Sequence, residues 1–528
     1  MVQVINKKMN VKTINAIKKS VCKVQGVNRA YNFETPYQLE AEYESGGTAF
    51  FVDPLEFGEK FPIKRNCRYL LTNFHVVQNF TQKNCILEWP ERNKSYLMAE
   101  VKFVSPNLDV AILELDVGSP QVKWWSGDHV QWLETIKNCK LNTTDIIKGA
   151  SQQITALGFP NLSQDYQISN GNLSSRGLGM LSCDLSINAG NSGGPLFFKN
   201  KVIGICTASV CDSERLALAV PIQEIFRFFN YFCSFQQQIL RLPCWGFSLK
   251  NLTTDYLAFK GIDEAFKGVL LKSIFPKQAA EKAGLKKGDI LMGIETKDTK
   301  GKITKYSIDC FGQTVFSSTS KMVRVDCVEF MLNLDPNYLI IHYYRRKKIN
   351  QTTIKIEPID FKVRTRFPAY ENLSYTVFGG LVFSAFHLNM LEGDEDEEEE
   401  TENIFDHGVL NTLKTSLGME SMVILTHIPP QSYTSFSTGL TENDQIVKVN
   451  NTKVKSIDHL ITLLDRISKK YYSTSNTVDN YITITTTNDT HVLSIPMLSE
   501  YEREMNRNNN PNIVLRLLRK KTERKRKR

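Results

Sequence analysis

The chain has 528 residues, a length that predicts roughly three domains of about 150 residues each. Hydrophobic residues make up 41%, charged residues 23% and aromatic residues 10% of it. These ordinary globular values exclude a wholly disordered, a collagen-like and a small disulfide-stapled protein. No apolar run approaches the roughly 20 residues that a membrane-spanning helix needs, so we expect no membrane partner.

The net charge of +9 is concentrated at one end of the chain. Residues 516–528 hold nine basic residues and one acidic residue, which leaves the rest of the chain close to neutral. A basic face spread over the fold is not supported, so we expect no nucleic-acid partner. The run RKKTERKRKR (519–528) predicts a nuclear import signal, an import receptor as partner and a nuclear or nucleolar location. RNA or DNA contact by this run and a tail without function are the alternatives.

The cysteines do not predict a secreted protein. There are eleven, an odd number, and they are spread thinly, unlike a disulfide framework. The first twenty residues, MVQVINKKMNVKTINAIKKS, have positive charge but no apolar stretch, so we expect no secretory signal and a reducing compartment, the nucleus or otherwise the cytoplasm. Cys206 and Cys211 lack a second Cys/His pair, and no glycine-rich phosphate loop occurs, so we expect neither a metal nor a nucleotide cofactor.

Residues 11 to about 235 alternate short β-rich runs with turn residues, among them GTAFFVD, CRYLLTNFHVV, LDVAILELD and GPLFFKNKVIGICTA. Many short strands at this spacing predict an all-β barrel or sandwich. The stretch 222–240 predicts a helix that closes this region. Two later regions then share one plan, a strand, a short helix, a turn and a strand, and the second adds an amphipathic helix over 455–467.

The strongest chemical signal is the run NAGNSGGPL, in which glycines surround Ser192. A serine hydroxyl attacks a carbonyl only with a base to take its proton and with donors aimed at the oxyanion. Glycines let the backbone turn tightly, so the N–H groups of Gly190 and Ser192 can point into one concavity. A hairpin turn without chemistry is the alternative. Cys183 is a poor candidate nucleophile, because SCDLS supplies no such turn.

The base should be a histidine at the end of a nearby strand. Only His75 and His129 precede Ser192. His75 follows the apolar run YLLTNF, whereas His129 lies in the polar stretch WWSGDHVQW, which favours His75. Asp109 stands just before the apolar run VAILEL, where a carboxylate can fix the tautomer of the histidine. A turn-capping role for Asp109 is the alternative.

These motifs resemble those of the Deg/HtrA family of trypsin-fold serine proteases. This sequence has TNFHVV, LDVAIL, LGFP and INAGNSGGPL where the family has TNAHVV, DLAVL, GNP or GFP, and INPGNSGGPL. The stretches NFETPYQ and FGGLVF are similar to plant and nuclear-type Deg proteases. Phe74 for alanine and Ala189 for proline are departures, and neither removes a catalytic group.

The resemblance implies a mainly β protein with a trypsin-like double β-barrel followed by two PDZ-like α+β modules. We place the protease domain at 11–240, a PDZ domain at 241–360 and a second, divergent PDZ-like domain at 361–500. The second domain contains an acidic insertion, 392–402, with nine carboxylates, which predicts a solvated loop or, alternatively, a docking site for a basic partner. A basic, disordered tail should fill 501–528.

The resemblance also implies residue roles. His75 would be the general base, Asp109 its orienter and Ser192 the nucleophile, with Gly190 and Ser192 forming the oxyanion hole. Ser186 lies where this fold places the base of its specificity pocket; without an acid there, small or medium aliphatic side chains are expected before the scissile bond. Peptide capture would fall at Trp245, Gly246 and Phe247, for which core packing is the alternative. The second module would serve assembly.

The sequence therefore predicts an ATP-independent serine endopeptidase that cuts misfolded or exposed protein segments in protein quality control. Its partners would be protein or peptide substrates and further copies of itself, in trimers or multiples of trimers. Two alternatives remain: a proteolytically silent PDZ-containing chaperone or adaptor, and a processing protease of narrow specificity, such as a viral one.

Overall fold

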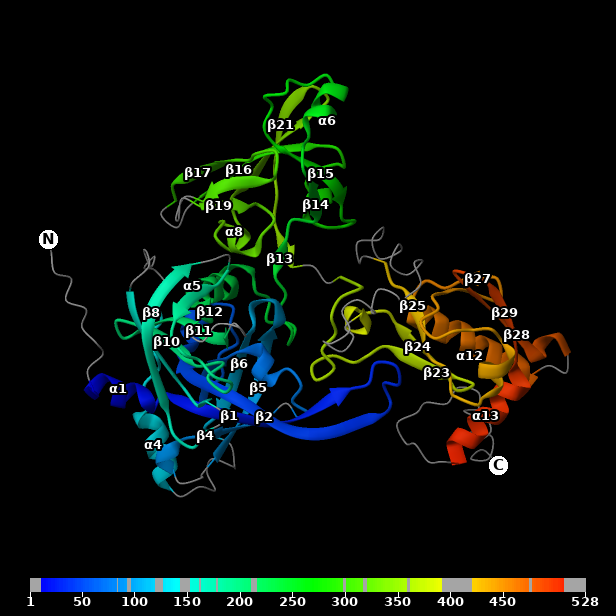
Figure 1. Cartoon of the computed structure of the whole chain (residues 1–528), viewed down its shortest axis with the longest axis horizontal. Helices are drawn as coiled ribbons and strands as arrows, with labels where there is room; N and C mark the ends of the chain where they lie inside the picture. Colours follow the sequence, from blue (N-terminus) through cyan, green and yellow to red (C-terminus); the bar gives the residue numbers. More distant parts are fainter. Residues whose placement is uncertain are drawn as a thin grey trace. The chain divides into compact units, whose positions relative to one another are not determined.

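The computed structural model describes residues 11–82, 84–92, 96–118, 127–142, 152–160, 163–176, 179–209, 216–297, 301–316, 321–358, 361–391, 420–473 and 477–507. The chain divides into two compact units, one of residues 1–28 and 43–360 and one of residues 29–42 and 361–528 (Figure 1). The acidic insertion 392–402 and the run 519–528 lie outside the described residues. Within those residues, every helix is too short or too polar to cross a bilayer.

The first unit begins with a closed antiparallel barrel in the strand order β1-β2-β3-β6-β5-β4. Side chains along β4 and β5 alternate between buried and less buried positions, while six successive residues of β6 are buried. The strands are β1 (Val21–Tyr31), β2 (Leu39–Val52), β3 (Cys67–Thr72), β4 (Asn84–Glu88), β5 (Tyr96–Ser105) and β6 (Val110–Asp116). The helical elements around it are α1 (Val11–Lys18), η1 (Pro54–Phe57), α2 (Phe74–Val77), η2 (Pro90–Arg92), η3 (Pro106–Leu108) and α4 (Gly127–Thr135).

A second closed barrel follows, in the order β10-β11-β12-β9-β8-β7 (Figure 1). The two barrels confirm the prediction of a trypsin-like double β-barrel. The strands are β7 (Gln152–Gly158), β8 (Gln167–Arg176), β9 (Leu181–Asp184), β10 (Pro195–Phe198), β11 (Lys201–Ser209) and β12 (Leu216–Pro221).

The helix predicted over 222–240 is too long. Helix α5 (Ile222–Arg227) passes into the π-helical turn η5 (Phe228–Phe232), Cys233 is extended, and the chain turns and bends over residues 235–238. The following residues hydrogen-bond to β5 instead, because the carbonyl of Gln238 accepts the N–H of Val104 and the N–H of Leu240 donates to the carbonyl of Val104.

The first PDZ-like module lies in the same unit. Its sheet runs in the order β14-β15-β16-β20-β21, with β17 paired to β16, so β14 is an edge strand. Its strands are β13 (Pro243–Cys244), β14 (Phe247–Lys250), β15 (Val269–Ile274), β16 (Ile290–Lys297), β17 (Ile303–Ser307), β18 (Gln313–Phe316), β19 (Lys321–Arg324), β20 (Leu339–Arg345), β21 (Lys348–Thr353) and β22 (Glu357–Pro358). Its helices are α6 (Thr254–Phe259), α7 (Ala279–Lys282) and α8 (Val328–Leu332).

The second unit holds the second PDZ-like module, with one sheet in the order β23-β24-β25 and another in the order β27-β26-β28-β29. The strands are β23 (Tyr375–Phe378), β24 (Leu381–Ala385), β25 (Val423–His427), β26 (Ile446–Val449), β27 (Thr452–Lys453), β28 (Tyr481–Thr486) and β29 (Thr490–Ser494). The helical elements are η6 (Leu388–Leu391), α11 (Tyr433–Ser437), α12 (Ile457–Ser473), η7 (Thr477–Asn480) and α13 (Ile495–Arg507).

Two boundaries in this unit differ from the sequence predictions. The helix expected over 455–467 is present but continues to Ser473. The boundary expected at residue 501 is wrong, because α13 runs through Arg507, with Leu498 and Glu502 1% and 0% exposed, and residues 508–528 lie outside the described residues. Apolar and acidic side chains of α13 therefore belong to the folded module.

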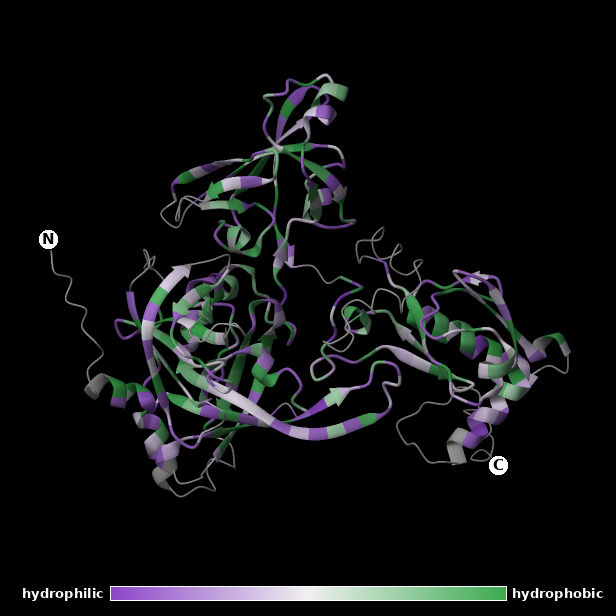
Figure 2. Cartoon of the chain, in the orientation of Figure 1, coloured by the Kyte–Doolittle hydropathy of each residue, from purple (hydrophilic) through white to green (hydrophobic). Residues whose placement is uncertain are grey.

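The second unit also contains residues 29–42, the tip of the β1–β2 hairpin. There the hydroxyl of Thr426 donates to the carbonyl of Glu34 at 2.8 Å, and the rings of Phe33 and His387 meet edge to face. Along β2, residues 40–44 are exposed and include three glutamates, whereas 49–52 are buried and hydrophobic (Figure 2). This change lets one strand serve both units, and the sequence analysis did not predict it.

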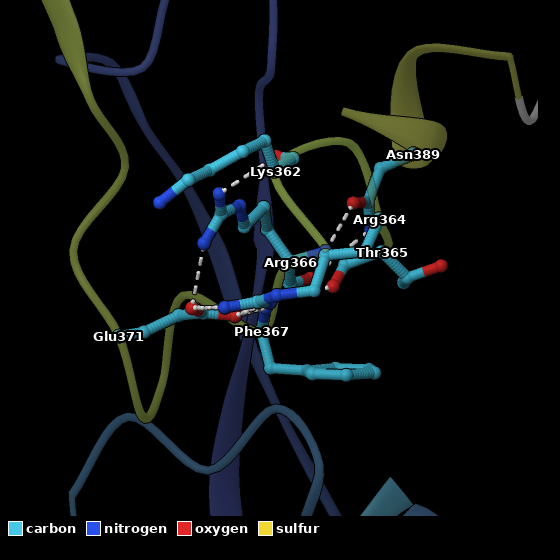
Figure 3. A network of polar contacts seen from close by, with 7 residues as sticks. All are labelled: Lys362, Arg364, Thr365, Arg366, Phe367, Glu371 and Asn389. Atoms are coloured by element: carbon cyan, nitrogen blue, oxygen red, sulfur yellow. Dashed lines mark hydrogen bonds and ion pairs between the residues drawn. The ribbon is translucent and has the colours of Figure 1, made fainter. Parts of the chain in front are cut away.

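A compact ion-pair network fixes the loop before β23 (Figure 3). Both carboxylate oxygens of Glu371 accept hydrogen bonds from Arg364 at 2.6 Å, and one accepts Arg366 at 3.1 Å. The side chain of Asn389 holds the backbone of Arg366 from the other side. Its Oδ1 accepts the N–H of Arg366 at 2.7 Å, and its Nδ2 donates to the carbonyl of Arg366 at 3.2 Å. Charge-assisted bonds of this bidentate kind are strong, so the loop has a defined shape.

Candidate active site

Two neighbouring antiparallel strands bring His75 and Asp109 together. His75 lies in α2 just after β3, and Asp109 lies just before β6, the partner of β3. The ring Nδ1 of His75 is 2.9 Å from Oδ2 and 3.0 Å from Oδ1 of Asp109, whose Oδ1 also accepts the backbone N–H of His75 at 3.0 Å. With the Nδ1 proton donated to the carboxylate, Nε2 is left as a proton acceptor, which is what a general base requires.

A hydroxyl from the second barrel completes the surroundings of Asp109. Thr207, in β11, donates its Oγ1 hydrogen bond to Oδ2 of Asp109. The backbone carbonyl of the same threonine accepts the hydroxyl of Ser192 at 3.0 Å. No hydrogen bond joins Ser192 Oγ to the His75 ring among the described residues. The structure thus brings Ser192 and Asp109 to one residue, Thr207, and the serine hydroxyl donates to that residue.

Glycines are required in the loop that carries Ser192. Gly190 and Gly193 have φ angles of 93° and 86°, a region that favours glycine. A Cβ on Gly193 would lie 2.0 Å from the carbonyl oxygen of Thr48 and 2.2 Å from Oγ1 of Thr72, so no other residue fits. The loop therefore lies directly against the first barrel.

Thr48 fixes two carbonyl groups of this loop. Its backbone N–H donates to the carbonyl of Ser192 at 2.8 Å, and its hydroxyl donates to the carbonyl of Gly190 at 2.8 Å. With these carbonyls turned toward Thr48, the N–H groups of Gly190 and Ser192 have no acceptor within the described structure. They are the two donors that the sequence predicts for an oxyanion hole.

Asn73 ties the two barrels together behind the site. Its side chain is fully buried. The amide Nδ2 donates to the backbone carbonyl of Asp109 at 2.8 Å, and Oδ1 accepts the N–H of Gly193 at 2.6 Å. Sequence reasoning missed Thr48, Asn73 and Thr207 as site residues. All three lie inside quoted runs, but none of these runs shows that Thr207 meets Asp109, which lies 98 residues away in the chain.

Ser186 lies between the buried residues Leu185 and Ile187, and its own side chain is exposed. The structure does not enclose it in a cavity, so its place in the specificity pocket stays a prediction. His129 lies in α4 rather than in a loop. Burial raises the pKa of the Cys183 thiol to about 12, which makes it a poor nucleophile near neutral pH.

The candidate peptide site of the first module is mixed in character. The side chains of Trp245 and Phe247 are 1% and 5% exposed, stack with centroids 5.9 Å apart, and belong to the core. The indole N–H donates to the carbonyl of Val325 at 2.8 Å. A bound peptide could therefore use the backbone around Gly246 and the free edge of β14. It could not pack on the two rings, because they are buried.

The second module offers no such edge at β24, which pairs with β23 on one side and β25 on the other. The turn between β23 and β24 is covered by α13. The carboxylate of Glu502 accepts the N–H of Gly379 at 2.8 Å, and a Cβ on Gly380 would lie 2.4 Å from the ring of Tyr501. In this module the amide that could bind a peptide carboxylate is already satisfied.

Comparison with known proteins agrees with this geometry. The family model of the trypsin-like peptidase domain matches residues 47–205, and that of the PDZ domain matches residues 367–502. The chain is 22% identical over 502 residues to Protease Do-like 2, chloroplastic, of Arabidopsis thaliana, covering 91% of this chain and 73% of that protein. It is 23% identical over 480 residues to the mitochondrial Do-like 3 protein of the same plant, covering 87% and 74%.

Similarity to solved structures is weaker. The HtrA-type protease AlgW with a decapeptide aligns with a TM-score of 0.44 at 17% identity, covering 66% of this chain and 98% of that one. The two barrels and the sequence matches define a trypsin-fold serine endopeptidase with PDZ modules. Within that class, the chain is similar to the Deg/HtrA proteases.

Proposed function

We propose that the protein is an ATP-independent endopeptidase that cuts exposed or misfolded protein segments with His75, Asp109 and Ser192. The observation that carries this proposal is the 2.9 Å contact between His75 Nδ1 and Asp109, whose carboxylate shares Thr207 with Ser192. That arrangement links the proposed base and the proposed nucleophile through Asp109 and Thr207. No cofactor is needed for acyl transfer by such a set.

The reaction begins when the hydroxyl of Ser192 leaves the carbonyl of Thr207 and turns to Nε2 of His75. His75 takes the proton as Ser192 Oγ attacks the peptide carbonyl, and the N–H groups of Gly190 and Ser192 hold the oxyanion. The imidazolium returns the proton to the departing amine, which breaks the peptide bond. Water, deprotonated by His75, then attacks the ester and releases the second product.

A specific observation keeps a second candidate. Because Ser192 donates to Thr207 rather than to His75, this conformation corresponds to a resting state. A protein held permanently in it would be a silent chaperone or adaptor that binds unfolded segments without cutting them. Cleavage of casein separates the two: the protease loses all turnover in Ser192→Ala while retaining binding, whereas equal turnover in both forms rules out the protease.

The substrate range, assembly and location form the finer part of the proposal. We expect the protein to act in protein quality control and to prefer substrates with a small or medium aliphatic side chain before the scissile bond, bound at Ser186. We also expect it to form homo-oligomers built from trimers. Residues 519–528 should direct it to the nucleus. Profiling cleavage sites on a denatured proteome tests the first: a broad aliphatic preference supports quality control, and a narrow motif favours a processing protease, such as a viral one. Deleting 519–528 from a fluorescent fusion tests the location.

A further inference from the structure

A cavity of about 510 Å³ opens on the first PDZ-like module, and its lining includes none of His75, Asp109 and Ser192. Its wall is built from the end of α6, the turn before β16 and the β20–β21 turn, and α6 and β21 lie at the end of the module away from β13 (Figure 1). The volume is within the range of sites for small ligands. Its charged lining consists of Lys260, Lys286, Lys287, Arg345, Arg346, Lys347 and Asp289.

The one carboxylate of the lining is already neutralised. Asp289 is 2% exposed and accepts two hydrogen bonds from Arg345, both at 2.6 Å. Its Oδ2 also accepts the backbone N–H of Lys286 at 2.7 Å. This pair is part of the fold of the module and leaves the charges of the other basic residues uncompensated.

Those other residues are Lys260, Lys286, Lys287, Arg346 and Lys347, all of them exposed. None forms an ion pair with an acidic side chain in the part of the chain that the structure describes. Beneath them lie the partly buried Tyr256, Ile262 and Tyr344 and the buried Ile290, which pack in a small apolar cluster. The cavity thus has an apolar floor and a rim of unpaired cations.

The backbone geometry of the β20–β21 turn does not favour the two basic residues at its centre. Arg345 and Lys348 pair across the turn, and the two residues between them, Arg346 and Lys347, have φ angles of 51° and 61°. Two-residue turns with positive φ at both positions favour Asn-Gly. Long basic side chains here add mutual repulsion to an unfavourable backbone conformation, and a bound anion would offset both.

We propose that this cavity binds a compact ligand bearing several phosphate groups. Lysine and arginine are the usual partners of phosphate oxygens. Five cations without an ion-pair partner line one open cavity, and of these Lys260 lies over the rings of Tyr256 and Phe259. An extended nucleic acid needs a continuous basic face, which a chain close to neutral outside residues 516–528 does not supply. The ligand can be free, like an inositol polyphosphate, or a lipid headgroup; Phe259, 81% exposed beside Lys260, is placed for lipid contact.

Titration calorimetry with inositol hexakisphosphate tests the proposal on the full chain carrying Ser192→Ala, which prevents self-digestion. The double variant Lys286→Glu/Lys287→Glu should weaken binding at least tenfold. Arg346→Asn/Lys347→Gly should also weaken it severalfold without lowering the melting temperature, because Asn-Gly suits the turn. The matched control Lys250→Glu/Lys272→Glu changes two exposed lysines outside the lining and should alter the affinity by less than twofold.

Two further arms identify the ligand. Sedimentation with phosphatidylcholine vesicles containing phosphatidylinositol bisphosphate distinguishes a lipid headgroup from a free ligand. Sedimentation of the protein that is lost in the cavity variants supports the headgroup. Binding of inositol hexakisphosphate without sedimentation supports the free ligand. Equal loss of affinity in the pocket and control variants, or no loss in either, would place binding elsewhere, for instance in the basic terminal run, and overturn the proposal. Poly-glutamate that binds the cavity as tightly as the hexakisphosphate would also overturn it, in favour of an acidic protein segment.

Discussion

Asn73 accepts the backbone N–H of Gly193 across the interface between the two barrels, at 2.6 Å. Its other amide atom holds the backbone of Asp109. One buried side chain therefore sets the distance between the loop of the proposed nucleophile and the strand end of the proposed orienter. The catalytic geometry depends on this link as well as on the three reacting side chains.

Replacing Asn73 should reduce turnover more than stability. Asn73→Ala removes both hydrogen bonds, and misplacing reacting groups by about 1 Å can cost on the order of a hundredfold in rate. We expect kcat to fall about tenfold to a hundredfold with little change in KM, measured on a peptide substrate. Asn230→Ala is the control, since the side chain of Asn230 likewise makes two hydrogen bonds to backbone groups, in this case by donating to the carbonyls of Glu56 and Phe226. Full kcat in Asn73→Ala would contradict the positioning role.

The side-chain hydroxyl of Thr207 should contribute to catalysis, independently of the backbone carbonyl of the same residue. Thr207→Val keeps the shape and the carbonyl that accepts Ser192 but removes the donor to Asp109. We expect kcat to drop about tenfold, since a hydrogen bond to a charged group contributes about 1.5–3 kcal/mol. Thr207→Ser retains the donor and should restore most of the turnover. Equal activity in both variants would show that the hydroxyl is dispensable.

Acid should weaken the second unit through Glu371. Burial alone would raise the pKa of this carboxyl, but hydrogen bonds and charge from Arg364, the N–H of Phe367 and the charge of Arg366 outweigh it, and the pKa is lowered from 4.5. A lowered pKa gives stability that is present above pH 4.5 and lost as the pH falls through the lowered value. At pH 7, Glu371→Gln should therefore destabilise the unit by about 2 kcal/mol.

Hydrogen exchange of residues 362–371 at several pH values measures this effect. The parent protein should lose protection on acidification, whereas Glu371→Gln should already lack it at pH 7. Glu357→Gln is the control, because a hydrogen bond from Lys282 likewise lowers the pKa of Glu357. The side chain of Glu357 is 42% exposed, so this substitution should change stability less than Glu371→Gln does. Equal protection in Glu371→Gln and the parent would show that the network does not hold this loop.

Thiol reagents should leave the enzyme active. Burial raises the pKa of Cys183 and Cys85 to about 12, so the reactive thiolate becomes abundant only at strongly alkaline pH. Iodoacetamide at pH 7 should modify neither and should not reduce turnover. Loss of activity together with alkylated Cys183 would point to a cysteine nucleophile and against Ser192.

Local motifs carried most of what the sequence could predict. His75, Asp109 and Ser192 each sit in a run whose strand and turn are readable, and antiparallel pairing of β3 with β6 then brings the first two together. The contacts of Asn73 and Thr207 depend on how two barrels meet, which no local pattern encodes. The helix predicted to 240 ended early because residues beyond Cys233 found hydrogen-bond partners in β5, a tertiary effect that overrides local preference.

The same reasoning explains what was missed in the PDZ-like modules. For Trp245 and Phe247 the sequence leaves a peptide groove and core packing open, and their burial depends on a core that includes Val325 and α8. The docking of residues 29–42 in the second unit could not be predicted, because their partners lie more than 300 residues away in the chain. Such contacts require the folded module.

Reaction with a fluorophosphonate, followed by mass spectrometry of the labelled peptide, tests the central claim most directly. The reagent reacts only with a serine whose hydroxyl is activated by a base and faced by oxyanion donors. The account predicts one adduct, on Ser192, absent in Ser192→Ala and formed at least a hundredfold more slowly in His75→Ala. Hydrolysis of casein with no adduct on Ser192, or an adduct that forms equally fast without His75, would contradict it.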